Sequence, residues 1–171
     1  MVFETGELES PIGKVFVTVQ GDRLCGLGFE EQWPRKAAQL EKRFGAVELR
    51  PTADPGGVLS LLRKYFAGEI EALDAIVVDT GGTPFQQRVW SELRKIPVGR
   101  TASYGDIARA IGAPTAVRAV GAANGANPVG IVVPCHRVIG SNGQLTGYGG
   151  GIERKRWLLR HESAQRELRV A

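Results

Sequence analysis

The break at residues 80–84 constrains the fold of this chain more than any other feature. Thr80-Gly81-Gly82 interrupts the regular patterns, and Thr83-Pro84 follows with the signature of a helix start. Strand-like alternation is confined to residues before the break, while the longer stretches after it have helical spacing. We therefore predict two units, residues 1–81 and residues 82–171, in a mixed α/β (α+β) fold.

The first unit is predicted to be a small α/β domain with antiparallel strands. Val15, Val17 and Val19 occupy alternate positions, and Gly21-Asp22 marks a turn before a second strand. Cys25 lies in that second strand with no histidine nearby in sequence, so we interpret it as a core residue. The remaining pattern predicts helices over residues 35–44 and 58–66 and a short strand over residues 75–78. We see no catalytic pattern here and expect a structural role.

The second unit is predicted to be mainly helical, with a pair of short helices at its centre. Ser103 and Asp106 have the spacing of a capping box. A second helix is predicted from Pro114 to about Asn124, after a turn that contains Gly112. This arrangement fits a helix-turn-helix. Taken alone, an ordinary pair of packed helices is the simpler interpretation, because only some such pairs bind DNA.

Pro134-Cys135-His136-Arg137-Val138 is the stretch with the most evident chemistry. The apolar run over residues 130–133 leads into it, so we predict a short strand that carries Cys135. A thiol held by a strand and followed by a histidine fits a nucleophile. The local residues equally allow a buried structural cysteine.

A nucleophilic cysteine needs a proton acceptor, and His136 is the nearest one in sequence. Neighbours on a strand point to opposite faces, so we expect a bridging water between the thiol and the imidazole. Glu162, on a helix predicted over residues 152–162, is the best acidic partner, and Lys155 shares its face. Cysteine, histidine and acid also describe a thiol hydrolase, which would need an oxyanion hole.

The composition narrows the function classes further. Two cysteines and two histidines exclude a four-cysteine zinc site and disfavour a mixed one, so we expect no metal and no cofactor. The sequence has no apolar run that could span a bilayer and no signal-peptide pattern, which favours the reducing cytoplasm. The net charge of +4 is compatible with a nucleic-acid partner, but many other proteins share it.

Several motifs in the second unit occur together in one known family. In order, they are Tyr104 in Ser-Tyr-Gly, Arg118 in Val-Arg-Ala-Val-Gly, Asn127-Pro128, Pro-Cys-His-Arg-Val, Tyr148 before glycines, and Trp157-Leu-Leu-x-His-Glu162. Over residues 83–162 the chain resembles the O6-alkylguanine-DNA alkyltransferases, also called methylated-DNA–protein-cysteine methyltransferases, in their short stand-alone form. The first unit is similar to the family's small α/β domain, with less specific motifs.

The resemblance implies DNA repair by a suicide reaction. An alkyl group would move once from O6-alkylguanine, or O4-alkylthymine, in double-stranded DNA to Cys135, with the target nucleotide flipped out. The implied catalytic residues are Cys135, His136, Glu162, Tyr104 and Asn127. The implied DNA-binding residues are Arg118, Tyr104, Gly121, Ala122, Gly125 and Arg137. The implied substrate pocket comprises Val133, Pro134, Tyr148, Gly149, Gly150 and Lys155.

The resemblance also implies how these residues act. Arg118 would fill the gap left by the flipped base in the minor groove, and Tyr104 would help protonate the leaving guanine. Asn127 would be a hinge between helix and cysteine, and Lys155 would lie at the edge of the site. Gly149 departs from the family, which commonly has serine there. We expect a monomer; the alternative function is a non-catalytic alkyltransferase-like protein, which Cys135 argues against.

Overall fold

In a computed structural model, the chain divides into two compact units, Met1–Gly81 and Gly82–Ala171. The structure describes the backbone of residues 1–170 and the side chains of residues 1–165. None of the helices in this described part combines the length and apolar character needed to cross a membrane.

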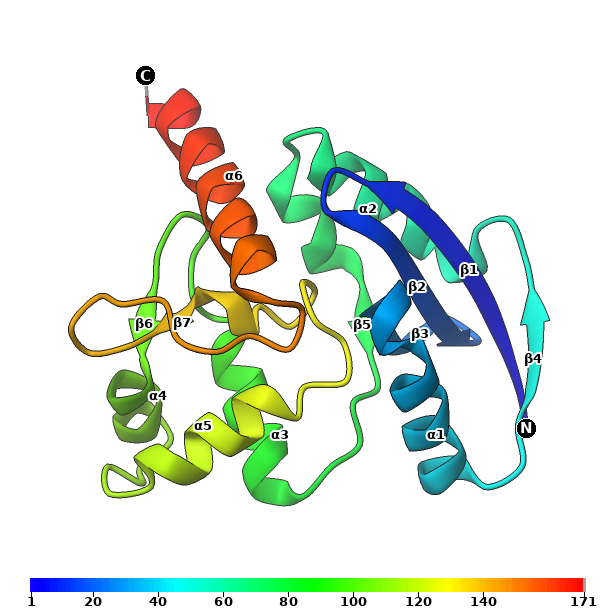
Figure 1. Ribbon diagram of the computed structural model, residues 1–171, viewed down its shortest axis with the longest axis horizontal. Coiled ribbons are helices and arrows are strands. Elements are labelled where there is room, and N and C mark those ends of the chain that lie inside the picture. Colours follow the sequence, from blue (N-terminus) through cyan, green and yellow to red (C-terminus); the bar gives the residue numbers. More distant parts are fainter. Residues whose placement is uncertain (171) are drawn as a thin grey trace. The chain divides into compact units, whose positions relative to one another are not determined.

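The first unit contains a five-stranded sheet with a helix on each face (Figure 1). Its elements are β1 (Val2–Ser10), β2 (Gly13–Gln20), β3 (Arg23–Phe29), η1 (Glu30–Gln32), α1 (Trp33–Phe44), β4 (Glu48–Pro51), η2 (Pro55–Gly57), α2 (Val58–Phe66), η3 (Ile70–Ala75) and β5 (Val77–Val78).

The sheet has the strand order β4-β1-β2-β3-β5. The three central strands are antiparallel, as predicted, and the outer strands β4 and β5 run parallel to their neighbours. Leu8 pairs with Val15 in the β1–β2 register, which places the alternating valines of β2 on one face. Val15, Val17 and Val19 are fully buried there, so their burial accounts for the alternation seen in the sequence.

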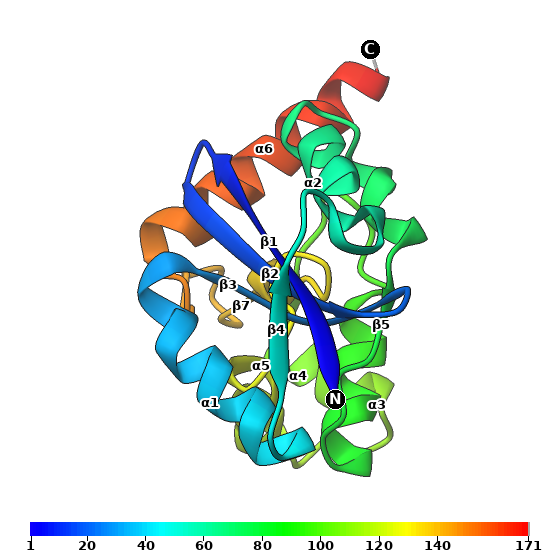
Figure 2. The ribbon, with the colours of Figure 1, turned by 90° about the vertical axis from the view of Figure 1, so that its right-hand side faces the viewer.

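The two longer helices of this unit lie on opposite faces of the sheet (Figure 2). On the α1 face, Phe3, Cys25 and Leu40 form a buried apolar cluster, with Phe44 packed against it. Cys25 is therefore a core residue, as expected. On the other face, Gly6 lies against Leu59 of α2 so closely that an added Cβ would come within 2.8 Å of it. Glycine at that position allows the helix to pack on β1.

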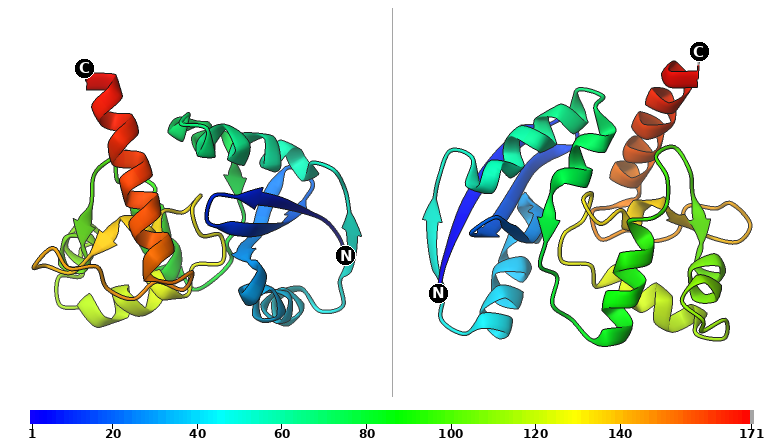
Figure 3. Two further views of the ribbon diagram at one scale, coloured as in Figure 1. Left: turned by 45° about the horizontal axis from the view of Figure 1, so that its top comes forward. Right: turned by 180° about the vertical axis from the view of Figure 1, so that it is seen from behind.

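The second unit is mainly helical (Figure 3). Its elements are α3 (Pro84–Leu93), β6 (Ala102–Ser103), α4 (Tyr104–Ala110), α5 (Val117–Gly125), η4 (Cys135–Arg137), β7 (Val138–Ile139) and α6 (Ile152–Val170). β6 and β7 form a small parallel ladder.

Capping boxes start two of these helices, as the sequence predicts. At α4, the Ser103 hydroxyl accepts from Asp106 N at 3.0 Å, and the Asp106 carboxylate accepts from Ser103 N at 2.8 Å. Thr83 and Gln86 form the equivalent pair at α3. Each cap satisfies two amides that a helix start leaves without partners. α4 and α5 pack together, so the predicted helix pair is confirmed.

The predicted strand over residues 130–133 is wrong. These residues form a turn, in which Val133 N donates to Val129 O at 3.0 Å and Ile131 has a positive φ of 70°. Cys135 lies in the short 3-10 helix η4, and only Val138–Ile139 after it is a strand. Residues 131–133 of the apolar run are buried, so their apolar character reflects burial and not sheet pairing.

Other boundaries differ by a few residues. The helix predicted from Pro114 begins at Val117, and the strand predicted over residues 75–78 shortens to β5. β4 was not predicted, because its residues are all exposed and show no alternation. α6 continues from the predicted end at residue 162 to Val170, since the polar residues beyond 162 carry no break. Ala171 lies outside the described residues.

Candidate active site

Two asparagine side chains at the end of α5 form hydrogen bonds with the backbone of the cysteine segment. Asn127, just after α5, donates from Nδ2 to Val133 O at 2.7 Å and accepts from Val129 N at 3.0 Å. Asn124, in the last turn of α5, donates to Cys135 O at 3.4 Å. Both asparagines are buried. The end of α5 is thereby fixed to the backbone that carries the thiol.

His136 and Glu162 form a buried pair beside Cys135. His136 Nε2 lies 2.8 Å from Glu162 Oε2, and the two side chains are 0% and 1% exposed. A carboxylate can only accept, so a neutral His136 donates through Nε2 and keeps its Nδ1 lone pair. Nδ1 is buried and makes no hydrogen bond within the described residues. This nitrogen is available as a proton acceptor.

Glu162 has a second hydrogen-bond partner, the guanidinium of Arg137. Arg137 Nε donates to Glu162 Oε1 at 2.7 Å, so each carboxylate oxygen has its own partner. Burial opposes ionisation of Glu162, but the charges and hydrogen bonds of His136 and Arg137 outweigh it and hold the pKa of Glu162 well below its usual range. Arg137 is itself buried, and this contradicts the expectation that it contacts DNA. A buried carboxylate requires a paired cation, and Arg137 supplies it.

Lys155 also lies deeper than predicted. It was expected at the edge of the site, but its side chain is fully buried. Its Nζ donates to Val138 O at 2.6 Å and to Thr146 O at 3.4 Å. Burial lowers the pKa of Lys155, while the charge of the Cys135 thiolate raises it. The face shared by Lys155 and Glu162 on α6 is therefore an inner face of the site.

The loop before α6 brings Tyr148 to the same region. Burial raises the pKa of the Tyr148 phenol well above its usual value, and the charges of Cys135 and Glu162 add to this effect. An added Cβ on Gly130 would lie 3.7 Å from the Tyr148 hydroxyl oxygen. Among the other predicted pocket residues, Val133 and Pro134 are buried, Gly150 is partly exposed and Gly149 is exposed.

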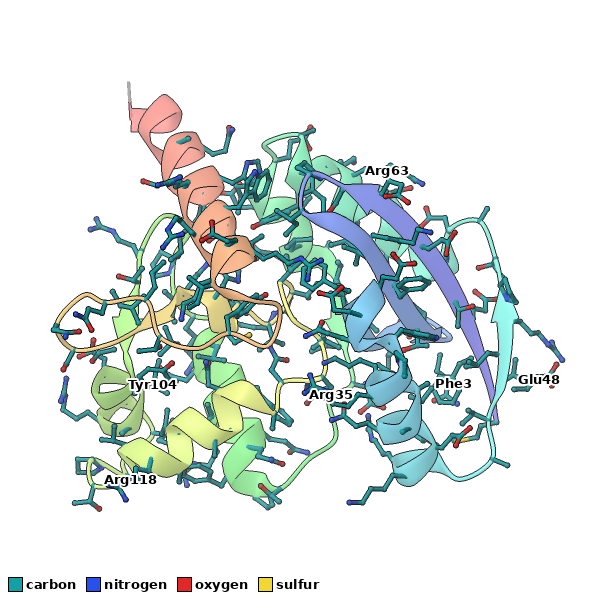
Figure 4. All side chains as sticks on the ribbon, in the orientation of Figure 1. Phe3, Arg35, Glu48, Arg63, Tyr104 and Arg118 are labelled. Atoms are coloured by element: carbon teal, nitrogen blue, oxygen red, sulfur yellow. The ribbon has the colours of Figure 1, made fainter. Side chains whose placement is uncertain are left out.

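Helix α5 presents a narrow outer face. Arg118, Ala122 and Gly125 are exposed and Gly121 is partly exposed, at positions that repeat along one side of the helix. Tyr104, the first residue of α4, lies beside this face, because an added Cβ on Gly121 would come 3.9 Å from its ring. Figure 4 shows both Tyr104 and Arg118 on this helix pair. The Tyr104 hydroxyl is 2.5 Å from Thr146 Oγ1.

Comparison with known proteins gives the family. Residues 84–164 match the model for the DNA-binding domain of 6-O-methylguanine DNA methyltransferase. A methylated-DNA–protein-cysteine methyltransferase of Shigella flexneri is 47% identical over 159 residues, which cover 91% of this chain and 93% of the relative. The chain belongs to the methylated-DNA–protein-cysteine methyltransferases. The crystal structure of Mycobacterium tuberculosis OGT in complex with DNA matches with a TM-score of 0.81 at 44% identity, covering 95% of this chain and 94% of that one.

Two residues of this methyltransferase site were not predicted from the sequence. Asn124 is one, because an asparagine inside a helix pattern gives no sign that its side chain reaches a distant carbonyl. Thr146 is the other, in a glycine-rich loop whose path sequence spacing does not define. The clue for Asn124 was its position three residues before Asn127, which places it on the inner side of α5.

Proposed function

We propose that this methyltransferase repairs alkylated double-stranded DNA by moving the alkyl group from O6 of guanine, or O4 of thymine, to Cys135. The observation that carries the proposal is the buried His136–Glu162 pair next to a cysteine whose backbone is tied to an exposed helix face. A relative, M. tuberculosis OGT, has been crystallised in complex with DNA.

The charge distribution supports DNA as the partner of the second unit. Residues 82–171 contain 13 Lys and Arg against 5 Asp and Glu, a net charge of +8. Residues 1–81 contain 9 against 13, a net charge of −4. A basic unit attracts the phosphate backbone without regard to sequence. We assign the DNA contact to the second unit and a structural role to the first.

The outer face of α5 suits the minor groove. This groove is narrow, and small residues such as Gly121, Ala122 and Gly125 let a helix backbone approach it closely. The exposed Arg118 at the start of α5 then has the reach to enter the base stack and occupy the space of an extruded nucleotide. Extrusion is required because the alkyl carbon on O6 is inaccessible inside a duplex.

The transfer itself uses the residues of the buried pair. His136 Nδ1 takes the Cys135 proton through a bridging water, and Glu162 stabilises the imidazolium that forms. The thiolate attacks the alkyl carbon, the carbon–O6 bond breaks, and its electrons remain on guanine. Protonation of the guanine ring by Tyr104 makes it a better leaving group. The lysine at the site, Lys155, offsets the thiolate charge.

The product is a thioether on Cys135. Water does not regenerate the thiol, because an alkyl thiolate is a poor leaving group from carbon, so each molecule acts once. No cofactor takes part, because the thiol supplies the only new bond. We infer a monomer acting in the cytoplasm, where a thiol stays reduced.

Intact mass spectrometry tests this function. The protein is incubated with a duplex that carries O6-methylguanine, and with an unmodified duplex as control. We expect the mass to increase by one methyl group in place of one hydrogen, and this change to be absent in Cys135→Ala. Binding of the lesion with an unchanged mass would instead indicate a non-catalytic alkyltransferase-like protein. Repeated turnover of an ester or peptide would indicate a thiol hydrolase.

A further inference from the structure

The guanidinium of Arg137 is bound on two sides inside the second unit. Nε donates to Glu162 Oε1 at 2.7 Å, and Nη1 donates to Ile96 O at 2.7 Å. Ile96 follows α3 and is buried, so the carbonyl that holds the guanidinium belongs to a fixed part of the unit. Arg137 therefore links the end of α3 to α6 through the segment that carries Cys135.

This arrangement leaves Glu162 little freedom. A carboxylate bound only by His136 could rotate about its last bond and exchange its two oxygens. With Arg137 on Oε1, the other oxygen, Oε2, is kept for His136 Nε2 at 2.8 Å. Hydrogen bonds to charged partners are short and directional, so this geometry also fixes the plane of the imidazole ring. The position of His136 Nδ1, the proposed proton acceptor, follows from that plane.

The charges of the buried groups favour the same conclusion. The titratable groups of the site are Cys135, His136 and Arg137 from η4, Glu162 and Lys155 from α6, and Tyr148 from the loop before it. Arg137 supplies the positive charge that the buried carboxylate of Glu162 requires.

We propose that Arg137 is a positioning residue of the thiol relay, which orients Glu162 and, through it, His136 Nδ1, the proposed acceptor of the thiol proton. The inference deepens the proposed function, since it concerns the same cysteine. It replaces the DNA-binding role that the sequence suggested for this arginine. Arg137 touches neither DNA nor the reacting atoms in this account and acts through Glu162.

The test measures the reactivity of Cys135 without DNA as well as with it. In a Cys25→Ala background, the rate of Cys135 alkylation by iodoacetamide is followed by mass from pH 5 to pH 9, approximately the range over which a histidine relay titrates. The variants are Arg137→Met, Arg137→Lys, Glu162→Gln and the double variant Arg137→Met/Glu162→Gln. Arg156→Met is the control, because Arg156 forms an ion pair with the exposed Glu153. Transfer from free O6-alkylguanine and from duplex DNA is measured in parallel.

We expect Arg137→Met to slow Cys135 alkylation about 10- to 100-fold at neutral pH, since small misplacements of a catalytic group cost that much. Arg137→Lys should recover part of the rate, and the double variant should be scarcely slower than Glu162→Gln alone. Transfer from the free base and from DNA should fall by the same factor.

Other results overturn the inference. A change in unfolding free energy with an unchanged rate of Cys135 alkylation would make Arg137 a structural residue only. A loss confined to the DNA substrate would restore the DNA-contact role. If Arg137→Met does not fold, Arg137→Lys and its coupling to Glu162→Gln decide the outcome. Failure of alkyl transfer in the wild type, with the iodoacetamide pattern intact, would contradict the proposed function and leave this inference supported.

Discussion

The side chain of Asn127 holds the backbone of Val133 at a distance of 2.7 Å from Nδ2 to the carbonyl oxygen. Through this bond, the residue after α5 fixes the turn that leads to Cys135. An outward movement of the helix during DNA binding would therefore be transmitted to the thiol. The bond gives a physical basis for the proposed hinge between α5, the helix proposed to contact DNA, and the cysteine.

Asn127→Ala should destabilise the protein and slow alkyl transfer. It leaves Val133 O and Val129 N without their side-chain partners in a buried place. We expect a loss of about 2–4 kcal/mol in unfolding free energy, measured by chemical denaturation. Asn142→Ala is the control: its Oδ1 also accepts from a backbone amide, Gln144 N at 3.1 Å, but in an exposed turn, so the loss should be about 1 kcal/mol or less. Similar losses for the two variants would contradict the hinge.

Arg118→Ala should impair repair of duplex DNA and spare the reaction with free O6-alkylguanine. Arg118 is exposed and lies outside the buried pair, so its loss affects base extrusion and not the thiol. We expect a loss of roughly tenfold or more on duplex, measured by single-turnover kinetics. Arg63→Ala, an equivalent change in the first unit (Figure 4), should leave both rates unchanged. Equal losses on both substrates would argue against a role in flipping.

Tyr104→Phe should slow transfer by about tenfold or more, because it removes the proposed proton donor to guanine. Thr146→Val is the matched control, since it breaks the same hydrogen bond and keeps the phenol. We expect Thr146→Val to transfer at close to the wild-type rate. If both variants lose the same activity, the Tyr104–Thr146 contact matters for structure and the phenol has no chemical role.

The pH dependence of stability should report the Glu162 interactions. A carboxyl whose folded pKa is lowered stabilises the fold above its unfolded value, about 4.5, and this contribution is lost as the pH falls through the native value. We expect Glu162→Gln to be less stable than wild type at pH 7, with the difference shrinking below about pH 4.5. Denaturation at several pH values measures this. Glu153→Gln, at an exposed carboxylate, should show no such convergence.

Parts of the fold that depend on neighbouring residues were predictable from the sequence. The capping boxes at Thr83 and Ser103 and the valine alternation in β2 each have a local cause, and the structure contains all three. The path of the cysteine segment has a distant cause. Asn127 accepts a hydrogen bond from Val129 N and so helps to hold the turn in which Ile131 has a positive φ. The β-branched residues of the run give no sign of this distant contact, so the run resembled a strand.

The burial of the cationic side chains of Arg137 and Lys155 could not be predicted from the sequence either. Arginine and lysine are rarely buried, so Arg137 was expected on the DNA surface and Lys155 at an edge. The partner of Arg137 is the carboxylate of Glu162, which lies 25 residues away in the sequence. Lys155 donates to backbone carbonyls, which no sequence pattern indicates. The contact between His136 and Glu162 was predictable, because the motifs that contain them resemble those of a known family.

The most direct measurement is the number and position of alkyl groups after reaction with excess DNA that carries O6-methylguanine. Digestion and peptide mass spectrometry distinguish Cys135 from Cys25, the core thiol of the first unit. The account predicts one methyl group per protein molecule, on the peptide that contains Cys135, with no further turnover. Methyl groups on Cys25, more than one per molecule, or continued release of unmodified guanine with an unmodified Cys135 would contradict it.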